Sequence, residues 1–184
     1  MRTALIGVLC LAGVAAAADN YKIDPIHSTV IYKIKHFGIG NAYGRFNNPT
    51  GTVSLDADAS KSTFEFTVQT ANLDTANAKR DSDLKGPDFF DVKQFPTISF
   101  KSSSVKSSGE SKFEITGDLT LHGVTKTITV PIEKTGEGDT KMMGYRTGWE
   151  AQVDLKRSDY GINGMPGGIG DDVHLVISFE AVKQ

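Results

Sequence analysis

Side chains alternate between apolar and polar in segment after segment of this sequence. In the longest case, residues 149 to 156 read W-E-A-Q-V-D-L-K. Because successive side chains of a β-strand point to opposite faces, a period of two predicts a strand with one face buried and the other in water. About eight such segments occur between residues 28 and 182, and this repetition predicts an all-β protein.

Short polar or glycine-containing breaks separate these segments, which favours antiparallel neighbours. One stretch differs from the rest, D-T-A-N-A-K-R-D-S-D-L-K-G-P at residues 74–87. Asp74 or Thr75 can cap a helix there and Gly86-Pro87 can end it, so we expect one short helix of about three turns. The sequence has no internal repeat or linker, and a single domain is expected.

Eight antiparallel strands with one apolar face have two ways to hide that face. They can close into a barrel, or they can form two sheets that pack against each other. Large aromatic side chains on the apolar face can fill the core of such a sandwich or line a cavity inside a barrel. The alternation alone does not choose between the two.

The first 18 residues have the layout of a secretory signal peptide. Met1-Arg2 precede an apolar stretch, and the small residues Ala16 to Ala18 follow it. We expect cleavage before Asp19 and an exported domain over residues 19–184. No apolar stretch reaches the roughly 20 residues that a membrane-spanning helix needs, so no stable membrane insertion is expected. The only cysteine, Cys10, lies in the leader, so an ordinary core must hold the mature domain.

The charge balance argues against a nucleic-acid partner. Removal of residues 1–18 takes away Arg2 and no acid, which leaves 19 Lys+Arg against 22 Asp+Glu and changes the formal net charge from −2 to −3. Lysines and acids are interspersed, without the basic block that a phosphate backbone demands.

Two histidines flank the first predicted strand, and neither indicates a catalytic or metal site. His27 and His36 are nine positions apart, about 30 Å on an extended chain, so they cannot bind one metal ion from this strand. His27 and Ser28 are adjacent and would point to opposite faces, and the G-x-S-x-G motif of hydrolases does not occur. We therefore predict no metal site and no catalytic residue.

Tyr32 and His36 bring polar groups to the apolar side of that strand, which they share with Val30 and Ile34. Buried polar groups need partners. One interpretation is structural, with both side chains bonded to backbone carbonyl groups. The other is that they anchor a ligand.

The glycine-rich stretch at residues 161–172, G-I-N-G-M-P-G-G-I-G-D-D, does not predict a phosphate site. It contains no lysine, no helix pattern follows it, and Asp171-Asp172 would repel a phosphate. A flexible connection that covers the mouth of a barrel is the interpretation that we prefer.

Six motifs match a known family pattern. They are D-P-I-H-S (24–28), H-F-G (36–38), G-R-F (44–46), F-F-D-V-K-Q-F-P-T-I-S-F-K-S (89–102), G-D-L-T-L-H-G-V-T-K (117–126) and R-S-D-Y-G-I (157–162). Through them the mature chain resembles, over nearly its whole length, the YceI-like family of polyisoprenoid-binding exported proteins. The resemblance implies an eight-stranded antiparallel, lipocalin-like barrel that holds a long isoprenoid lipid, often as a homodimer, without catalysis.

Given such a barrel, the parity of each strand predicts which side chains face the cavity. The expected cavity residues are Val30, Tyr32, Ile34, His36, Phe46, Phe64, Phe66, Phe100, Phe113, Ile115, Tyr145, Trp149, Val153, Ile177 and Phe179. Phe89 and Phe90, just after the predicted helix, are expected to close one end. Arg45, Lys79 and Arg80 are expected to meet a polar head group at the mouth. No cofactor is expected besides the lipid itself.

The leading hypothesis is periplasmic binding, transport or storage of a long-chain isoprenoid lipid, of polyprenyl or quinone type, or of another amphiphilic lipid. A second hypothesis is a hydrolase or isomerase that acts on a lipophilic substrate in the same cavity, with His36 and Tyr32 as acid–base groups. A third is a sandwich-shaped module with a filled core that binds no lipid.

Overall fold

A computed structural model describes residues 17–184, whose regular structure is mainly β-strand. The strands are β1 (Asp19–Ile23), β2 (Thr29–His36), β3 (Gly40–Asn47), β4 (Thr50–Leu55), β5 (Thr63–Gln69), β6 (Leu73–Asp74), β7 (Thr97–Gly109), β8 (Lys112–Leu121), β9 (Val124–Asp139), β10 (Tyr145–Lys156) and β11 (Ile169–Lys183). The helix α1 (Ala78–Leu84) and three short 3₁₀ turns, Ala59–Lys61, Thr70–Asn72 and Arg157–Tyr160, complete the chain.

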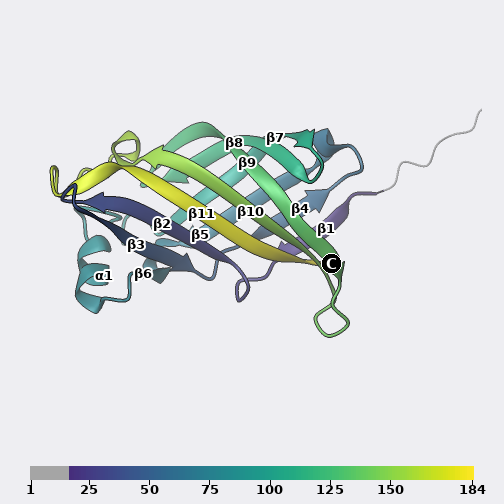
Figure 1. The fold of residues 1–184 in the computed structure, drawn as a ribbon, viewed down its shortest axis with the longest axis horizontal. Helices are drawn as coiled ribbons and strands as arrows, with labels where there is room; N and C mark the ends of the chain where they lie inside the picture. Colours follow the sequence, from purple (N-terminus) through teal and green to yellow (C-terminus); the bar gives the residue numbers. More distant parts are fainter. Residues whose placement is uncertain (1–16) are drawn as a thin grey trace, which may run out of the picture.

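The strands close into a barrel (Figure 1). Hydrogen-bonded pairs run in the order β1, β4, β5, β7, β8, β9, β10 and β11, and β11 pairs with β1 again. Every one of these pairs is antiparallel. The prediction of an eight-stranded antiparallel barrel is confirmed, and the sandwich alternative is wrong.

Three of the eight barrel strands are interrupted, which is why the chain has more strand segments than the barrel has strands. β2 pairs with residues 173–178 of β11 and β1 pairs with residues 181–183, so β1 and β2 are two parts of one strand. In the same way, β4 pairs with β1 and β3 pairs with β2, so β3 and β4 are two parts of the next barrel strand. β5 pairs with β4 and β6 pairs with β3, so β5 and β6 are two parts of the third. Pro25 and Pro49, which have no N–H to donate, lie at the first two interruptions.

One end of the barrel is packed solid. A cluster of buried side chains surrounds Trp149, whose indole ring lies 5.2 Å from the ring of Phe64 and 5.6 Å from the ring of Phe113. Ala181 of β11 is fully buried in the same cluster. Each large side chain buried in this way stabilises the fold by about 1.5–3 kcal/mol. This cluster forms the floor of the barrel.

The opposite end is closed differently, by α1 and the connection that follows it. There β6 pairs with β3, and no pairing joins β6 to β7 among the described residues. α1 and residues 85–96 occupy this position instead, at the left of Figure 1. The barrel therefore has a packed end and a less regular end.

The helix is shorter than predicted and begins later. α1 has seven residues, and its N-cap is Asn77, whose side chain accepts a hydrogen bond from the Arg80 N–H at 3.0 Å. The expected caps at Asp74 or Thr75 are wrong, because Thr75 donates from its N–H and its hydroxyl to Asp81. Ala76 then has a φ of 58°, which a right-handed helix cannot contain.

Between residues 17 and 184, no helix is both long and apolar enough to cross a lipid bilayer. The predicted signal peptide, residues 1–18, lies outside the described residues except for its last two positions, and it remains a prediction.

Candidate functional site: an apolar cavity in the barrel

Above the packed floor, the barrel encloses a cavity of about 630 Å³. Ligand cavities in proteins measure about 300–1,000 Å³, so this one is large enough to hold a small molecule or a long chain. Its wall consists mainly of the inward-facing apolar side chains of the barrel strands. The large aromatic side chains of this sequence therefore do not fill the whole interior.

Most of the residues that parity predicted for the cavity lie on its wall. These are Val30, Tyr32, Ile34, His36, Phe46, Phe64, Phe66, Phe100, Ile115, Val153, Ile177 and Phe179. Phe89 and Phe90, which were expected to close one end, also line it. Phe46 and Phe90 meet edge to face, with ring centroids 5.3 Å apart, and join the barrel wall to the segment after α1. Strand parity thus located the wall without any knowledge of its shape.

Three predicted residues lie elsewhere. Trp149 and Phe113 have the expected parity, but Trp149 belongs to the buried cluster at the floor and Phe113, partly buried, packs against it. The rings of Phe64 and Phe179 line the cavity next to Trp149. Tyr145 begins β10 at the far end of the barrel, where its ring lies 5.6 Å from the Lys183 ammonium. Parity gives the direction of a side chain and not its height along the barrel axis.

Of the three basic residues expected at the mouth, only Arg80 lines the cavity. Its guanidinium donates to the Thr75 hydroxyl and carbonyl oxygens at 2.9 and 2.7 Å. Arg45 forms an ion pair with Asp74 at 3.2 Å, and Lys79 forms one with Asp83 at 3.0 Å. Both Arg45 and Lys79 are exposed, and neither lies on the cavity wall.

A cation that was not predicted, Arg157, also lies on the cavity wall. Its guanidinium donates hydrogen bonds of 2.7 to 3.1 Å to the carbonyl oxygens of Ile162, Gly164, Ile169 and Gly170. The glycine-rich stretch is therefore held in place over the cavity and is less free than expected. The sequence feature that could have predicted this role is the position of Arg157 just before the glycine-rich stretch, because the carbonyl groups of such a loop have no strand partners and need other donors.

Among the described residues, Tyr32 and His36, the two polar side chains on the inner face of β2, do not form the hydrogen bonds that the structural interpretation requires. Neither the Tyr32 hydroxyl nor the His36 ring forms a hydrogen bond within residues 17–184, so the expected bonds to backbone carbonyl groups are wrong. Burial raises the pKa of Tyr32 to about 12, and the Arg80 charge opposes this rise. The phenol ring lies over Gly44, where any Cβ would overlap it. Tyr32 is therefore a neutral, protonated group on the wall.

Tyr32 and His36 also do not form an acid–base pair. They are four positions apart on one strand, which corresponds to about 13 Å. The His36 ring instead contacts the neighbouring Phe37 ring at 4.7 Å. A proton cannot pass directly between the two side chains over such a distance.

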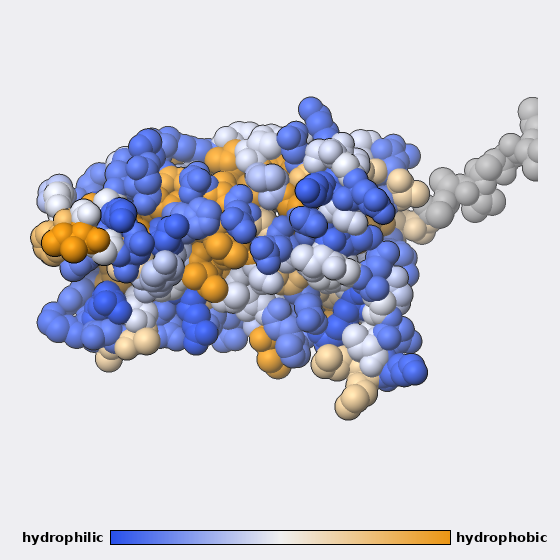
Figure 2. All heavy atoms as spheres, viewed as in Figure 1, coloured by the Kyte–Doolittle hydropathy of each residue, from blue (hydrophilic) through white to orange (hydrophobic). Residues whose placement is uncertain are grey.

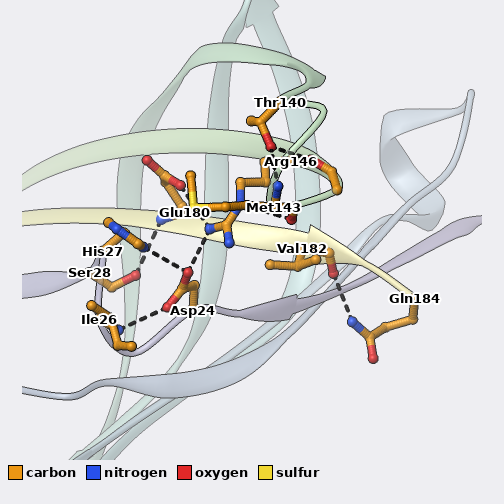
Figure 3. Close-up of polar contacts among 11 residues, drawn as sticks. Asp24, Ile26, His27, Ser28, Thr140, Met143, Arg146, Glu180, Val182 and Gln184 are labelled. Atoms are coloured by element: carbon orange, nitrogen blue, oxygen red, sulfur yellow. Dashed lines mark hydrogen bonds and ion pairs between the residues drawn. The ribbon is translucent and has the colours of Figure 1, made fainter.

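A second polar cluster lies outside the cavity, where β1 ends (Figure 3). Asp24 Oδ2 accepts from Arg146 Nη1 at 2.6 Å and contacts His27 Nδ1 at 2.8 Å, and the same Arg146 nitrogen donates to Glu180 at 3.0 Å. Ligand atoms of Asp24, His27 and Glu180 lie within 4.8 Å of one another, as in a metal site. However, the arginine already supplies a cation to both carboxylates, so the cluster is a network of ion pairs.

Comparison with known proteins agrees with this architecture. A YceI-like domain is recognised over residues 21–181. A UPF0312 protein of Pseudomonas aeruginosa is 41% identical over 98% of this chain and 95% of its own length. The crystal structure of Burkholderia cenocepacia BcnA superposes with a TM-score of 0.79 at 24% identity, over 87% of this chain and 99% of that one.

A more distant structure shares the fold. It is a polyisoprenoid binding domain from Saccharophagus degradans, with a TM-score of 0.68 and 12% identity over 89% of this chain and 98% of that one. The recognised domain covers nearly all of the described residues, and the Pseudomonas relative matches almost from end to end. The chain therefore belongs to the family of proteins with a YceI-like domain.

Proposed function

We propose that this protein binds a long-chain isoprenoid lipid, of polyprenyl or quinone type, in the barrel cavity and carries or stores it in the periplasm. The observation that supports this most directly is the cavity itself, an apolar volume of about 630 Å³ above a packed floor. The polyisoprenoid binding domain with the same fold gives independent support for the class of ligand. The periplasm follows from the signal peptide that the sequence predicts.

The distribution of polar groups suits a ligand with an apolar tail and a polar head. The deep part of the wall is aromatic and aliphatic, as at Phe64 and Phe179. The charged residues on the wall are three cations, Arg80, Lys156 and Arg157, and one acid, Asp83, and they belong to α1 or lie where β10 passes into the following 3₁₀ turn. A tail would fill the deep part, and a head group would remain beside these cations.

Transfer energetics favour a carrier. A forty-carbon chain that left water would gain roughly 30 kcal/mol at about 0.8 kcal/mol per carbon, beyond the ceiling for non-covalent binding. Such a lipid starts instead in a membrane, which solvates it as well as the cavity does. The net free energy of transfer is then small, so the lipid can be both taken up and released.

Catalysis is not part of this proposal. Tyr32 stays protonated at neutral pH, and His36 has no acid–base partner on β2. We expect His36→Ala to leave lipid uptake unchanged within about twofold, because the histidine contributes one small part of a large wall. Turnover of a lipophilic ester or isomer that His36→Ala abolishes would favour the enzyme hypothesis instead.

A narrowed cavity tests the proposal directly. Val153 lines the cavity and its neighbour Gln152 points out of the barrel and is exposed. Val153→Trp should reduce the amount of lipid that organic extraction releases from the purified protein by several-fold, because the indole ring occupies the tail's volume. Gln152→Trp is the matched control and should extract like the wild type. Native mass spectrometry of the wild type should show the adduct mass, and repeated lipid-free preparations without uptake would contradict the proposal.

A further inference from the structure

Exposed apolar side chains gather at the end of the barrel where the cavity wall meets the loops. Phe37 and Ile39 in the β2–β3 turn, Tyr43 on β3, and Met165 in the glycine-rich stretch are all exposed, and Ile39 is 90% exposed. We call these four residues the mouth rim. Figure 2 shows hydrophobic side chains at this end of the barrel, at the left of the view. Tyr43 and Met165 also contribute to the lining of the cavity, so the rim is continuous with its wall.

Two different loops hold the mouth rim together. The Phe37 N–H donates to the Gly168 carbonyl oxygen at 2.7 Å, which ties the β2–β3 turn to the glycine-rich stretch. Gly168 has no side chain, and a Cβ there would lie 3.0 Å from Met165 and 3.3 Å from Phe37. The two apolar side chains therefore pack on either side of this glycine and face outward together.

Phe37 and Met165 both have a strained backbone conformation. Phe37 and Met165 have φ angles of 49° and 54°, in the left-handed region that bulky residues seldom occupy. Such conformations persist only where the surrounding structure enforces them, and they are common at functional sites. Folding alone would favour a small polar or glycine residue at both positions.

The strands β2 and β3, which the turn with Phe37 and Ile39 connects, carry only positive charge, whereas Asp171 and Asp172 on the neighbouring β11 lie 4.0 and 2.8 Å from the Lys156 ammonium. Residues 25–55 contain Lys33, Lys35 and Arg45 and no aspartate or glutamate. Within residues 17–184, neither Lys33 nor Lys35 lies within 4.0 Å of a carboxylate, whereas Arg45 is paired with Asp74. Lysines near an anionic membrane surface contribute about 1 kcal/mol each to binding. Exposed apolar tips above unpaired lysines are the combination that binds peripheral proteins to anionic bilayers.

We propose that the mouth rim inserts into an anionic lipid bilayer, with Lys33 and Lys35 against the head groups, so that the cavity opens toward the membrane. This inference deepens the proposed function, because it identifies the surface from which the lipid enters and to which it leaves. The most exposed rim residue, Ile39, lies at the tip of the β2–β3 turn and can reach between lipid head groups.

Vesicle co-sedimentation with the mature chain tests the docking directly. Wild-type protein should sediment with vesicles of phosphatidylethanolamine and phosphatidylglycerol in a 3:1 ratio and much less with phosphatidylcholine vesicles. Ile39→Ser should weaken binding by about tenfold or more, since one buried isoleucine side chain accounts for that much. Lys33→Gln and Lys35→Gln should each weaken it by about fivefold, and only with the anionic vesicles.

The other end of the barrel provides the matched control. Met142 lies in the β9–β10 connection and is 93% exposed, much like Ile39. It is separated from the mouth rim by the length of β11, because residue 169 pairs with His36 and residue 182 with Arg146. Met142→Ser should bind vesicles like the wild type. Equal losses for Ile39→Ser and Met142→Ser, or a wild type that does not sediment, would overturn the proposal.

Two further measurements separate the remaining outcomes. Ile39 is too exposed to affect folding, and an unchanged emission spectrum of the buried Trp149 would verify this.

A dimer in analytical ultracentrifugation that Ile39→Ser dissociates would assign the mouth rim to a second copy of the chain and overturn docking. Lipid loading from detergent micelles should be the same for Ile39→Ser and wild type. Vesicle binding without any loading would contradict the proposed function and leave the docking intact.

Discussion

At the scale of single residues, Arg146 connects three parts of the barrel. It lies near the start of β10 and donates to Asp24, at the end of β1, and to Glu180, on β11. The side chains of Arg146 and Asp24 are only 12% and 11% exposed, so the pair is largely removed from water. Removal of Arg146 would leave the Asp24 carboxylate with His27 and the Ile26 N–H as its partners in a largely buried position, which is costly.

We therefore expect Arg146→Ala to lower the free energy of unfolding by about 2–4 kcal/mol. Urea denaturation at pH 7, followed by tryptophan fluorescence, would measure it. The exposed ion pair of Lys183 with Asp19 is the control, and Lys183→Ala should change stability by less than about 1 kcal/mol. Similar small effects for both variants would show that the Arg146 network does not stabilise the barrel.

The same network predicts a pH dependence. Hydrogen bonds from His27 and Arg146 lower the pKa of Asp24, against the opposing effect of burial. Because the pKa in the folded protein lies below the unfolded value of about 3.9, this stabilisation is fully present above pH 4 to 5. It is lost as the pH falls through the folded value. The difference in stability between wild type and Asp24→Asn should shrink as the pH falls below 4, whereas a difference that grows below pH 4 would contradict it.

At the scale of secondary-structure elements, the interruptions of the strands were only partly predictable. The alternation of side chains located most strands, and the Asn48-Pro49 break was visible in the sequence. That β1 and β2 follow each other along β11 was not, because it depends on pairing between residues about 150 positions apart. The start of α1 was also missed, since the contact of Thr75 with Asp81 competes with capping and leaves no trace in helix propensity.

Gly51 tests the importance of the second interruption. Its φ is 153°, and a Cβ at this position would collide with the backbone carbonyl oxygen of Glu65 on β5. Gly51→Ala should destabilise the protein by more than about 2 kcal/mol, because backbone on both strands has to move. Gly138 on β9 has no atom within 4 Å of such a Cβ, so Gly138→Ala should be close to neutral. Equal midpoints in urea for the two variants would contradict this account of the break.

At the scale of the whole molecule, the hollow interior was the feature that alternation left undecided. A barrel and a sandwich bury the same parity of side chains, and whether space remains depends on how the strands tilt and stagger. The barrel was predicted from the family resemblance, whereas the cavity was observed only in the structure. The same limit explains Trp149 and Phe113, whose parity is correct and whose depth places them in the floor.

A hollow barrel should gain stability from its ligand. A ligand that binds only the folded state at 100 times its dissociation constant adds about 2.7 kcal/mol, or roughly 5–10 °C in the melting temperature of a domain this size. Calorimetry of lipid-extracted protein before and after reloading with a polyprenyl lipid should show this rise. Val153→Trp should show a much smaller rise. A melting temperature that does not respond to loading would mean that the lipid does not occupy the cavity of the folded barrel.

The packed floor has a consequence for the direction of traffic. Under the proposed function, the packed floor prevents a lipid from passing straight through the barrel, so the lipid would leave by the end at which it entered. The tail end that enters first would then be the last to leave. Uptake and release would use the same opening, and a polar head group that enters last would be the first part to reach a recipient.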